Sequence, residues 1–212
     1  MTRGLFISFE GGEASGKSVQ AKRLAESLER DGHDVVLTRE PGGTPLGERI
    51  RDIVLHTKDV PLAPEADVLL FSAARAQHVR DVIRPALAAG KIVISDRFFD
   101  STVAYQGAGH GADAAGVAAV TSFAVGRTRP HRTYVLDLPL EAALRRRTGH
   151  ERRWDRFEVS EQEFHRRLRD GYLRLAAAEP ERVVVIDGDR EPDAIARDIR
   201  RDVEVILRAV RR

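Results

Sequence analysis

The residues best suited to chemistry form the stretch G-G-E-A-S-G-K-S at positions 11–18. Its spacing matches G-x-x-x-x-G-K-[ST], the pattern of a loop whose backbone N–H groups bind the phosphates of a nucleoside triphosphate at a helix N-terminus. Lys17 would reach the outer phosphates, and Ser18 would bind Mg²⁺. A glycine-rich turn could carry this pattern by accident, but the strand pattern before it and the helical pattern after it favour a phosphate loop. The predicted triphosphate contacts are Gly11, Gly12, Glu13, Ala14, Ser15, Gly16, Lys17, Ser18 and Val19.

Two more polar clusters each follow a short apolar run. Residues 34–38 lead into the turn R-E-P-G-G-T at 39–44, and residues 91–96 end in Asp96, which Arg97 follows. Ligands of open parallel sheets bind at the carboxyl ends of the strands. A strand-terminal carboxylate such as Asp96 is typical beside a phosphate loop. On composition alone, however, the 39–44 segment could be a surface turn, and Asp96 with Arg97 could be only an ion pair.

Helical spacing groups several side chains that could recognise a base. Phe71 and Arg75 are four residues apart, and Thr102, Tyr105 and Gln106 follow one another at i, i+3 and i+4. An aromatic ring beside a guanidinium can stack on a nucleobase and hydrogen-bond to it. Taken alone, Phe71 is more typical of a core residue.

Two positions near these groups carry weaker signals. Asp100 or Ser101 is expected to cap the helix that carries Thr102. Arg51 lies on an amphipathic helical pattern that starts at Leu46, and by itself it is typical of a solvated side chain.

The elements that would position these groups alternate along the chain. Apolar strand patterns cover residues 5–9, 34–38, 91–96, 133–137 and 182–186. Helical patterns cover residues 19–28, start at Leu46 and at Pro64, cover 114–125, and return over 164–175 and 195–206. Strands that alternate with helices predict an α/β fold with a five-stranded, doubly wound parallel sheet.

A dense arginine run interrupts the helical pattern near Gly149. Its members are Arg145, Arg146, Arg147, Arg152, Arg153 and Arg156. Charge runs are usually solvent-facing, but this one is also typical of a movable flap that carries phosphate-binding arginines. We predict a lid at about residues 145–158.

The length and composition of the chain limit the classes of protein to which it can belong. The 212 residues suit one domain, residues 1–212, with room for a lid. Absence of cysteine excludes disulfides, thiolate metal sites and a cysteine nucleophile. No run approaches 18 apolar residues, so we expect neither a signal peptide nor a membrane partner, and a cytoplasmic location. A net charge of only +2 gives no reason to expect a nucleic-acid partner.

Five segments together resemble the bacterial thymidylate kinase family. They read F-E-G-G-E-A-S-G-K-S, T-R-E-P-G-G-T, L-L-F-S-A-A-R-A-Q-H, D-R-F-F-D-S-T-V-A-Y-Q-G and D-R-F-E, in order and over nearly the whole chain. The resemblance implies a P-loop NTPase fold with an arginine-rich lid. It further implies a homodimeric enzyme that phosphorylates dTMP to dTDP with ATP and Mg²⁺. A related kinase for another nucleotide or a deoxynucleoside is the alternative.

The resemblance also implies roles for single residues. Glu13 would lie near the sugar of dTMP, Tyr105 beside that sugar, and Arg39, Arg51 and Arg97 near its phosphate. Phe71 would stack on thymine, with Arg75, Thr102 and Gln106 completing the base site. Ser18 and Asp96 would hold Mg²⁺. The implied catalytic residues are Lys17, Glu13, Asp96, Arg97 and Arg156, the last because Ala14 stands where some relatives carry a loop arginine.

The chain departs from the commonest family pattern at three positions. Val19 replaces a second hydroxyl after Ser18, Phe98 replaces a more frequent tyrosine, and Ala74 replaces a frequent acidic residue. Loss of the hydroxyl at position 19 would weaken triphosphate binding, although the backbone N–H groups of the loop remain.

Overall fold

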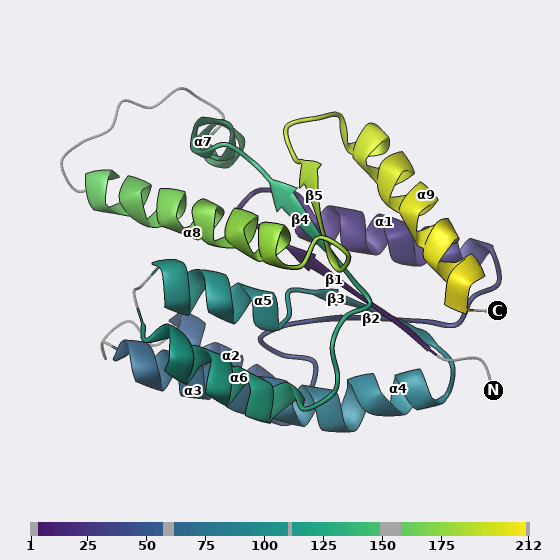
Figure 1. The fold of residues 1–212 in the computed structure, drawn as a ribbon, viewed down its shortest axis with the longest axis horizontal. Coiled ribbons are helices and arrows are strands. Elements are labelled where there is room, and N and C mark those ends of the chain that lie inside the picture. Colours follow the sequence, from purple (N-terminus) through teal and green to yellow (C-terminus); the bar gives the residue numbers. More distant parts are fainter. Residues whose placement is uncertain (1–3, 57–61, 110–111, 149–157, 211–212) are drawn as a thin grey trace.

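A five-stranded parallel sheet forms the centre of the computed structural model, which describes residues 4–56, 62–109, 112–148 and 158–210 (Figure 1). The strand order is β2-β3-β1-β4-β5. The strands are β1 (Leu5–Glu10), β2 (Val35–Arg39), β3 (Ile92–Asp96), β4 (Arg132–Asp137) and β5 (Val183–Asp187). The predicted five-stranded parallel sheet is therefore confirmed.

Helices connect the strands and cover both faces of the sheet. They are α1 (Lys17–Arg30), α2 (Pro45–His56), α3 (Pro64–His78), α4 (Arg84–Ala88), α5 (Phe99–Thr102), α6 (Ala114–Val125), α7 (Leu140–Thr148), α8 (Glu158–Ala178) and α9 (Pro192–Val210). Two π-helical turns, η1 (Val79–Ile83) and η2 (Val103–Gly109), continue α3 and α5. No helix in the described part of the chain is both long and apolar enough to cross a membrane.

The period-two alternation of β1 explains why both faces are covered. Leu5, Ile7 and Phe9 pack with α1 and α9, which lie side by side in Figure 1. Phe6 points the other way, into a core shared with η1 and α4. All of β1 is buried, as a strand covered on both faces must be.

The strand order also fixes where ligands can bind. After β1 the chain builds β2 and β3 on one side of it and β4 and β5 on the other. The carboxyl end of β1 is therefore a topological switch point, where helices diverge and leave a crevice. The phosphate-loop sequence begins at this point.

The predicted cap of the helix after β3 is wrong. Helix α5 begins at Phe99 with no side-chain cap at Phe98. Asp100 instead accepts two hydrogen bonds from Arg182, with N–O distances of 2.7 and 2.8 Å. Ser101 Oγ donates to Glu10 Oε2 at 2.5 Å. Asp100 and Ser101 therefore hydrogen-bond to residues distant in the sequence instead of capping the helix.

Candidate active site

The glycine loop between β1 and α1 has the backbone conformation that its sequence predicts. Gly11 has a φ of 131°, and a Cβ there would lie 2.5 Å from the carbonyl oxygen of Leu136. Gly16 precedes α1 with a φ of 93°. These left-handed conformations favour glycine, and they turn the backbone from β1 into α1, which starts at Lys17. The N–H groups of a first helical turn are suited to bind a phosphate.

Lys17 lies inside the loop. Its Nζ donates to the carbonyl oxygen of Gly12 at 2.5 Å and to Ser15 Oγ at 3.3 Å. Burial, together with the nearby Arg97 charge, lowers the pKa of Lys17 to about 7. A bound phosphate would add to the negative charge of Asp96, Glu10 and Glu13 and would favour the charged form of this buried amine.

Ser18, in the first turn of α1, meets Asp96 at the end of β3. In the pairing of β1 with β3, Phe9 lies opposite Asp96, so the end of β3 reaches the start of the glycine loop. Ser18 Oγ donates a hydrogen bond to Asp96 Oδ2. Hydroxyl and carboxylate oxygens are ligands that Mg²⁺ accepts, and Mg²⁺ commonly completes its shell with substrate phosphates and waters. Within the described residues no group of three or more acidic or histidine side chains forms a cage for an ion.

Arg97 occupies a strained position between the loop and the helices after β3. Its φ is 72°, which is unfavourable for a residue with a Cβ. Its guanidinium donates to the carbonyl oxygen of Gly11 at 3.3 Å, to Ser101 Oγ at 3.0 Å and to Tyr105 OH at 3.0 Å. Burial opposes its charge, but Tyr172, Tyr105 and Glu10 outweigh this effect and raise the pKa of Arg97. The arginine therefore stays charged beside the phosphate loop.

A cavity of about 610 Å³ extends from the phosphate loop toward α2 and α3. This volume is in the range of small-molecule sites. Twelve predicted site residues line it: Glu13, Ala14, Lys17, Ser18, Arg39, Arg51, Phe71, Asp96, Arg97, Thr102, Tyr105 and Gln106. The fold thus brings residues from six separate segments to one surface.

The cationic groups on the far side of this cavity have specific partners. Arg39 pairs with Glu48 at 3.1 Å and is 56% exposed in its side chain. Arg51 donates to the carbonyl oxygen of Pro41 at 2.9 Å. Phe71 is half-buried and contributes to the cavity wall, so the core role that this residue type suggests by itself is not what the structure shows.

Arg75 is the predicted base-site residue that does not line the cavity. Its side chain is 1% exposed. Its guanidinium donates to Glu40 Oε2 at 2.7 Å, to Thr102 Oγ1 at 2.9 Å and to the carbonyl oxygen of Phe98 at 3.2 Å. Glu40 also contacts His78 Nδ1 at 3.0 Å. Arg75 thus lies behind the cavity wall and holds Thr102 in place.

Sequence reasoning missed three polar residues of the cavity wall. Glu40, Asp67 and Ser101 all line it. Asp67 stands four residues before Phe71 on α3, so helical spacing could have revealed it. Glu40 belongs to the R-E-P-G-G-T turn, whose middle residues are buried although their composition suggested a surface turn.

The arginine run is described only in part. Arg145 and Arg146 lie on α7, and both are near Asp189, at 3.6 Å each. Arg146 also donates to the carbonyl oxygens of Ala14, at 3.3 Å, and Gly188, at 2.8 Å. An arginine of the run therefore touches the phosphate loop. Arg156, the predicted catalytic member, lies outside the described residues.

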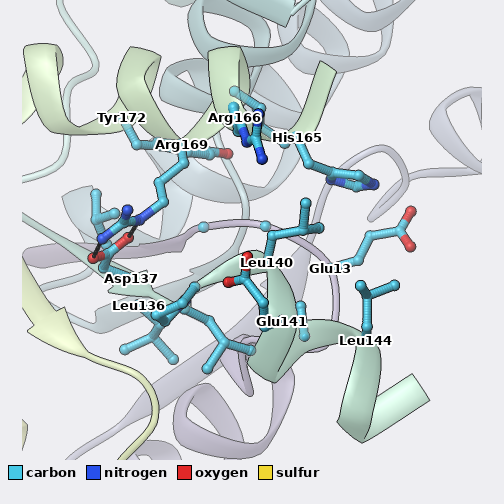
Figure 2. Close-up of a pocket in the computed structure, with 17 residues that line it drawn as sticks. Glu13, Leu136, Asp137, Leu140, Glu141, Leu144, His165, Arg166, Arg169 and Tyr172 are labelled. Carbon is cyan, nitrogen blue, oxygen red and sulfur yellow. Dashed lines mark hydrogen bonds and ion pairs between the residues drawn. The ribbon is translucent and has the colours of Figure 1, made fainter. Parts of the chain in front are cut away.

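A second, smaller hollow of about 160 Å³ opens between α7 and α8 (Figure 2). Gly11, Gly12 and Glu13 form its border with the phosphate loop. Much of its wall is apolar, with contributions from Leu138, Leu140, Ala143, Leu144 and Leu168. Arg169 closes one side through a bidentate pair with Asp137, at 2.6 and 2.7 Å.

The fold and the site together define a class of protein. A parallel sheet with a phosphate loop after its central strand, a serine–aspartate pair beside it, and arginines around an acceptor cavity are the parts of a P-loop phosphotransferase. This class transfers a phosphoryl group between two bound nucleotides or from a nucleotide to another acceptor.

Comparison with known proteins identifies the family within that class. The family model described as thymidylate kinase matches residues 9–199. The chain is 48% identical to a thymidylate kinase of Symbiobacterium thermophilum, over 96% of this chain and 94% of that protein. It is 50% identical to a thymidylate kinase of Caulobacter vibrioides, over 92% and 93%. The chain belongs to the thymidylate kinase family, and the predicted family is confirmed.

A solved structure agrees with this assignment. The crystal structure of thymidylate kinase from Ehrlichia chaffeensis superposes with a TM-score of 0.79. The match covers 95% of this chain and 99% of that chain, at 33% sequence identity. The predicted P-loop NTPase fold is thereby confirmed.

Proposed function

We propose that this chain transfers the γ-phosphoryl group of ATP to the phosphate of dTMP, giving ADP and dTDP. One observation carries the proposal: a single cavity joins the phosphate loop to three arginines and to an aromatic and amide wall. Family membership points to the same reaction. The γ-phosphate would lie at Lys17, and the acceptor phosphate would lie toward Arg39, Arg51 and Arg97.

The reaction needs no strong base, because the attacking oxygen of dTMP is already an ionised phosphate. Two anionic groups must approach each other, so positioning and charge neutralisation carry the rate. Lys17 would contact the outer phosphates, and Arg97 would hold the acceptor. Mg²⁺, held by Ser18 and Asp96 and by phosphate oxygens, would neutralise charge on the triphosphate when bound.

The base would occupy the wall formed by Phe71, Thr102 and Gln106. Phe71 supports this placement because its ring lines the cavity rather than the core. Tyr105 and Glu13 would lie near the sugar. Arg75 would act on the base site indirectly, by holding Thr102 in place. Its guanidinium already donates to Glu40, Thr102 and the carbonyl oxygen of Phe98.

Arg156 is proposed as the arginine that stabilises charge in the transition state. Ala14 supports this role, because it leaves the phosphate loop without an arginine of its own. Arg156→Ala should lower the turnover number about a hundredfold while dTMP binding stays nearly unchanged. Arg152→Ala is the control, and equal losses in both variants would mean that the run is only a charged face.

Homodimerisation is proposed from exposed apolar side chains on α3 and α6. These helices pack together, and α3 also packs on α2. Phe123 is 92% exposed and Leu69 is 57% exposed. Large apolar groups of this kind often mark a protein interface. Light scattering should show a dimer that Phe123→Glu dissociates; a monomeric wild-type chain would contradict the proposal.

The reaction itself is tested with a panel of nucleoside monophosphates and deoxynucleosides, ATP and Mg²⁺, with products identified by chromatography. We expect dTMP to be the fastest acceptor and dTDP to be the product. Faster transfer to another nucleotide or to a deoxynucleoside would favour a different kinase. The single domain and the cytoplasmic location expected from sequence stay predictions.

A further inference from the structure

Glu10 is a buried carboxylate that the motif and the proposed function leave unused. It is the last residue of β1, directly before the glycine loop, and it is 0% exposed. It stands two residues after Ser8 and four after Phe6, so its side chain lies on the face of the sheet away from α1 and α9. Burial, followed by the charge of Asp100, raises the pKa of Glu10 to about 7. Burying an ionised carboxylate costs free energy, so Glu10 is expected to have a role that offsets this cost.

Three donors converge on this carboxylate from two separate parts of the chain. Oε1 accepts the backbone N–H of Phe98 at 2.7 Å. Oε2 accepts the hydroxyl of Ser101 at 2.5 Å and that of Tyr172 at 3.2 Å. Phe98 and Ser101 bracket the start of α5, and Tyr172 is on α8. Glu10 therefore anchors the segment that directly follows Arg97.

Ser101 connects the anchor to the Arg97 guanidinium. Ser101 Oγ accepts from Arg97 Nη1 at 3.0 Å while it donates to Glu10. On the other side of Arg97, its backbone N–H donates to the carbonyl oxygen of Phe9 at 2.9 Å. The left-handed conformation of Arg97 is thus held from both sides, as a strained residue requires.

We propose that Glu10 is a positioning residue for phosphoryl transfer: its carboxylate fixes the segment from Phe98 to Ser101 and, through the Ser101 hydroxyl, aims the Arg97 guanidinium at the acceptor phosphate. This inference rests on the proposed function, because it assigns Glu10 an effect on the acceptor side of that reaction. It predicts that the anionic form of Glu10 promotes phosphoryl transfer and does not stabilise the fold.

The variant Glu10→Gln separates these two effects. The amide has nearly the same shape, its oxygen can still accept from Phe98, and its NH₂ can donate to Ser101 or Tyr172 if their hydroxyls rotate. The fold is therefore expected to survive. The negative charge beside Arg97 is lost, and so is the acceptor that orders the hydroxyl chain.

Steady-state kinetics at pH 8 provide the main test. We expect kcat/KM for dTMP to fall at least tenfold in Glu10→Gln, the scale of one lost charged hydrogen bond, with KM for ATP changed less than twofold. Glu179→Gln is the matched control, because Glu179 pairs with Arg129 and Arg182 away from the cavity. Normal kinetics in folded Glu10→Gln, or equal losses for both substrates together with lower stability, would overturn the inference.

A double-mutant cycle tests the proposed route through Ser101. Ser101→Ala keeps the carboxylate but removes the shared hydroxyl, so it should reproduce the loss in kcat/KM for dTMP even if Glu10→Gln fails to fold. The double variant should be no worse than the more impaired single variant. Additive losses, or a folded Ser101→Ala with normal kinetics, would contradict the route.

The wild-type chain in the same assay keeps the inference separate from the proposed function. If the wild type prefers another monophosphate, the dTMP assignment fails. The variants are then compared with that monophosphate, and the positioning role is tested unchanged.

Discussion

Gln106 Nε2 donates to Asp67 Oδ2 across 2.8 Å at the wall of the cavity. An ionised aspartate only accepts hydrogen bonds, so this contact forces the amide NH₂ toward Asp67 and directs the amide oxygen elsewhere. An oxygen acceptor suits the N3–H of thymine, whereas cytosine presents an acceptor at that position. The pair thus connects an acidic residue of α3 to the choice of base.

Asp67→Asn should weaken this selection, because an asparagine can donate as well as accept and no longer fixes the amide of Gln106. We expect KM for dTMP to rise up to about tenfold, with KM for ATP unchanged. The control is Asp81→Asn, which alters a similar pair with Gln77 at an exposed site. Unchanged KM in Asp67→Asn would show that the pair does not orient the base.

Arg75→Ala should destabilise the protein as well as impair dTMP binding. The substitution leaves Glu40, which is 5% exposed, without its arginine partner. Breaking one side of a buried ion pair typically costs about 3 kcal/mol or more. Urea denaturation would measure the loss in unfolding free energy. Arg84→Ala is the control, since Arg84 donates to the neutral oxygens of Thr128 and Val125 and should cost less. Equal costs would argue against the ion pair as the cause.

Lys17→Ala should abolish transfer without unfolding the chain. Lys17 faces the glycine loop rather than the apolar core, and burial lowers its pKa to about 7. Loss of one charge-stabilising donor costs about a hundredfold or more in rate. Turnover and thermal melting should be compared with Lys22→Ala, which removes an exposed lysine paired with Glu26. Near-normal turnover in Lys17→Ala would contradict its role at the phosphates.

Stability should depend on pH through Glu10. Its pKa is about 7 in the folded protein and near the ordinary glutamate value of 4.5 when unfolded. Between these values the folded state holds a proton that the unfolded state has lost, so the contribution of Glu10 to the unfolding free energy falls as pH rises. The unfolding free energy of Glu10→Gln relative to wild type should therefore increase from pH 5 to pH 8, on the order of 3 kcal/mol.

Glu179→Gln provides a control of opposite sign for this pH dependence. The hydrogen bond from Arg182 lowers the pKa of Glu179. Its ionised form therefore stabilises the folded state above the unfolded pKa, and this stability is lost as pH falls. The relative stability of Glu179→Gln should decrease as pH rises toward the unfolded pKa of 4.5 and should stay level from pH 5 to pH 8. A shift of the same sign in both variants would exclude the proposed effect of Glu10.

The sequence by itself determined the structural features that depend only on residues close together in the chain. The glycine loop from Gly11 to Ser18 could be predicted because its spacing, its strand and its helix are contiguous. The central strands β1, β3 and β4 could be predicted from apolar runs because both of their faces are covered. The edge strands β2 and β5 are partly exposed, but they too carry apolar runs. The lining residues Thr102, Tyr105 and Gln106 could be grouped because one helical stretch carries them.

Only the tertiary structure decided which distant groups pair. Asp100 was expected to cap a helix, but Arg182, 82 residues away, takes its carboxylate. Arg75 turns behind the cavity because Glu40, from another segment, is buried beside it. Glu10 gave no local signal, since its donors come from the segment after β3 and from α8. A buried charge is stable only when oppositely charged or hydrogen-bonding groups surround it. The strand order and the packing of the helices decide which groups those are.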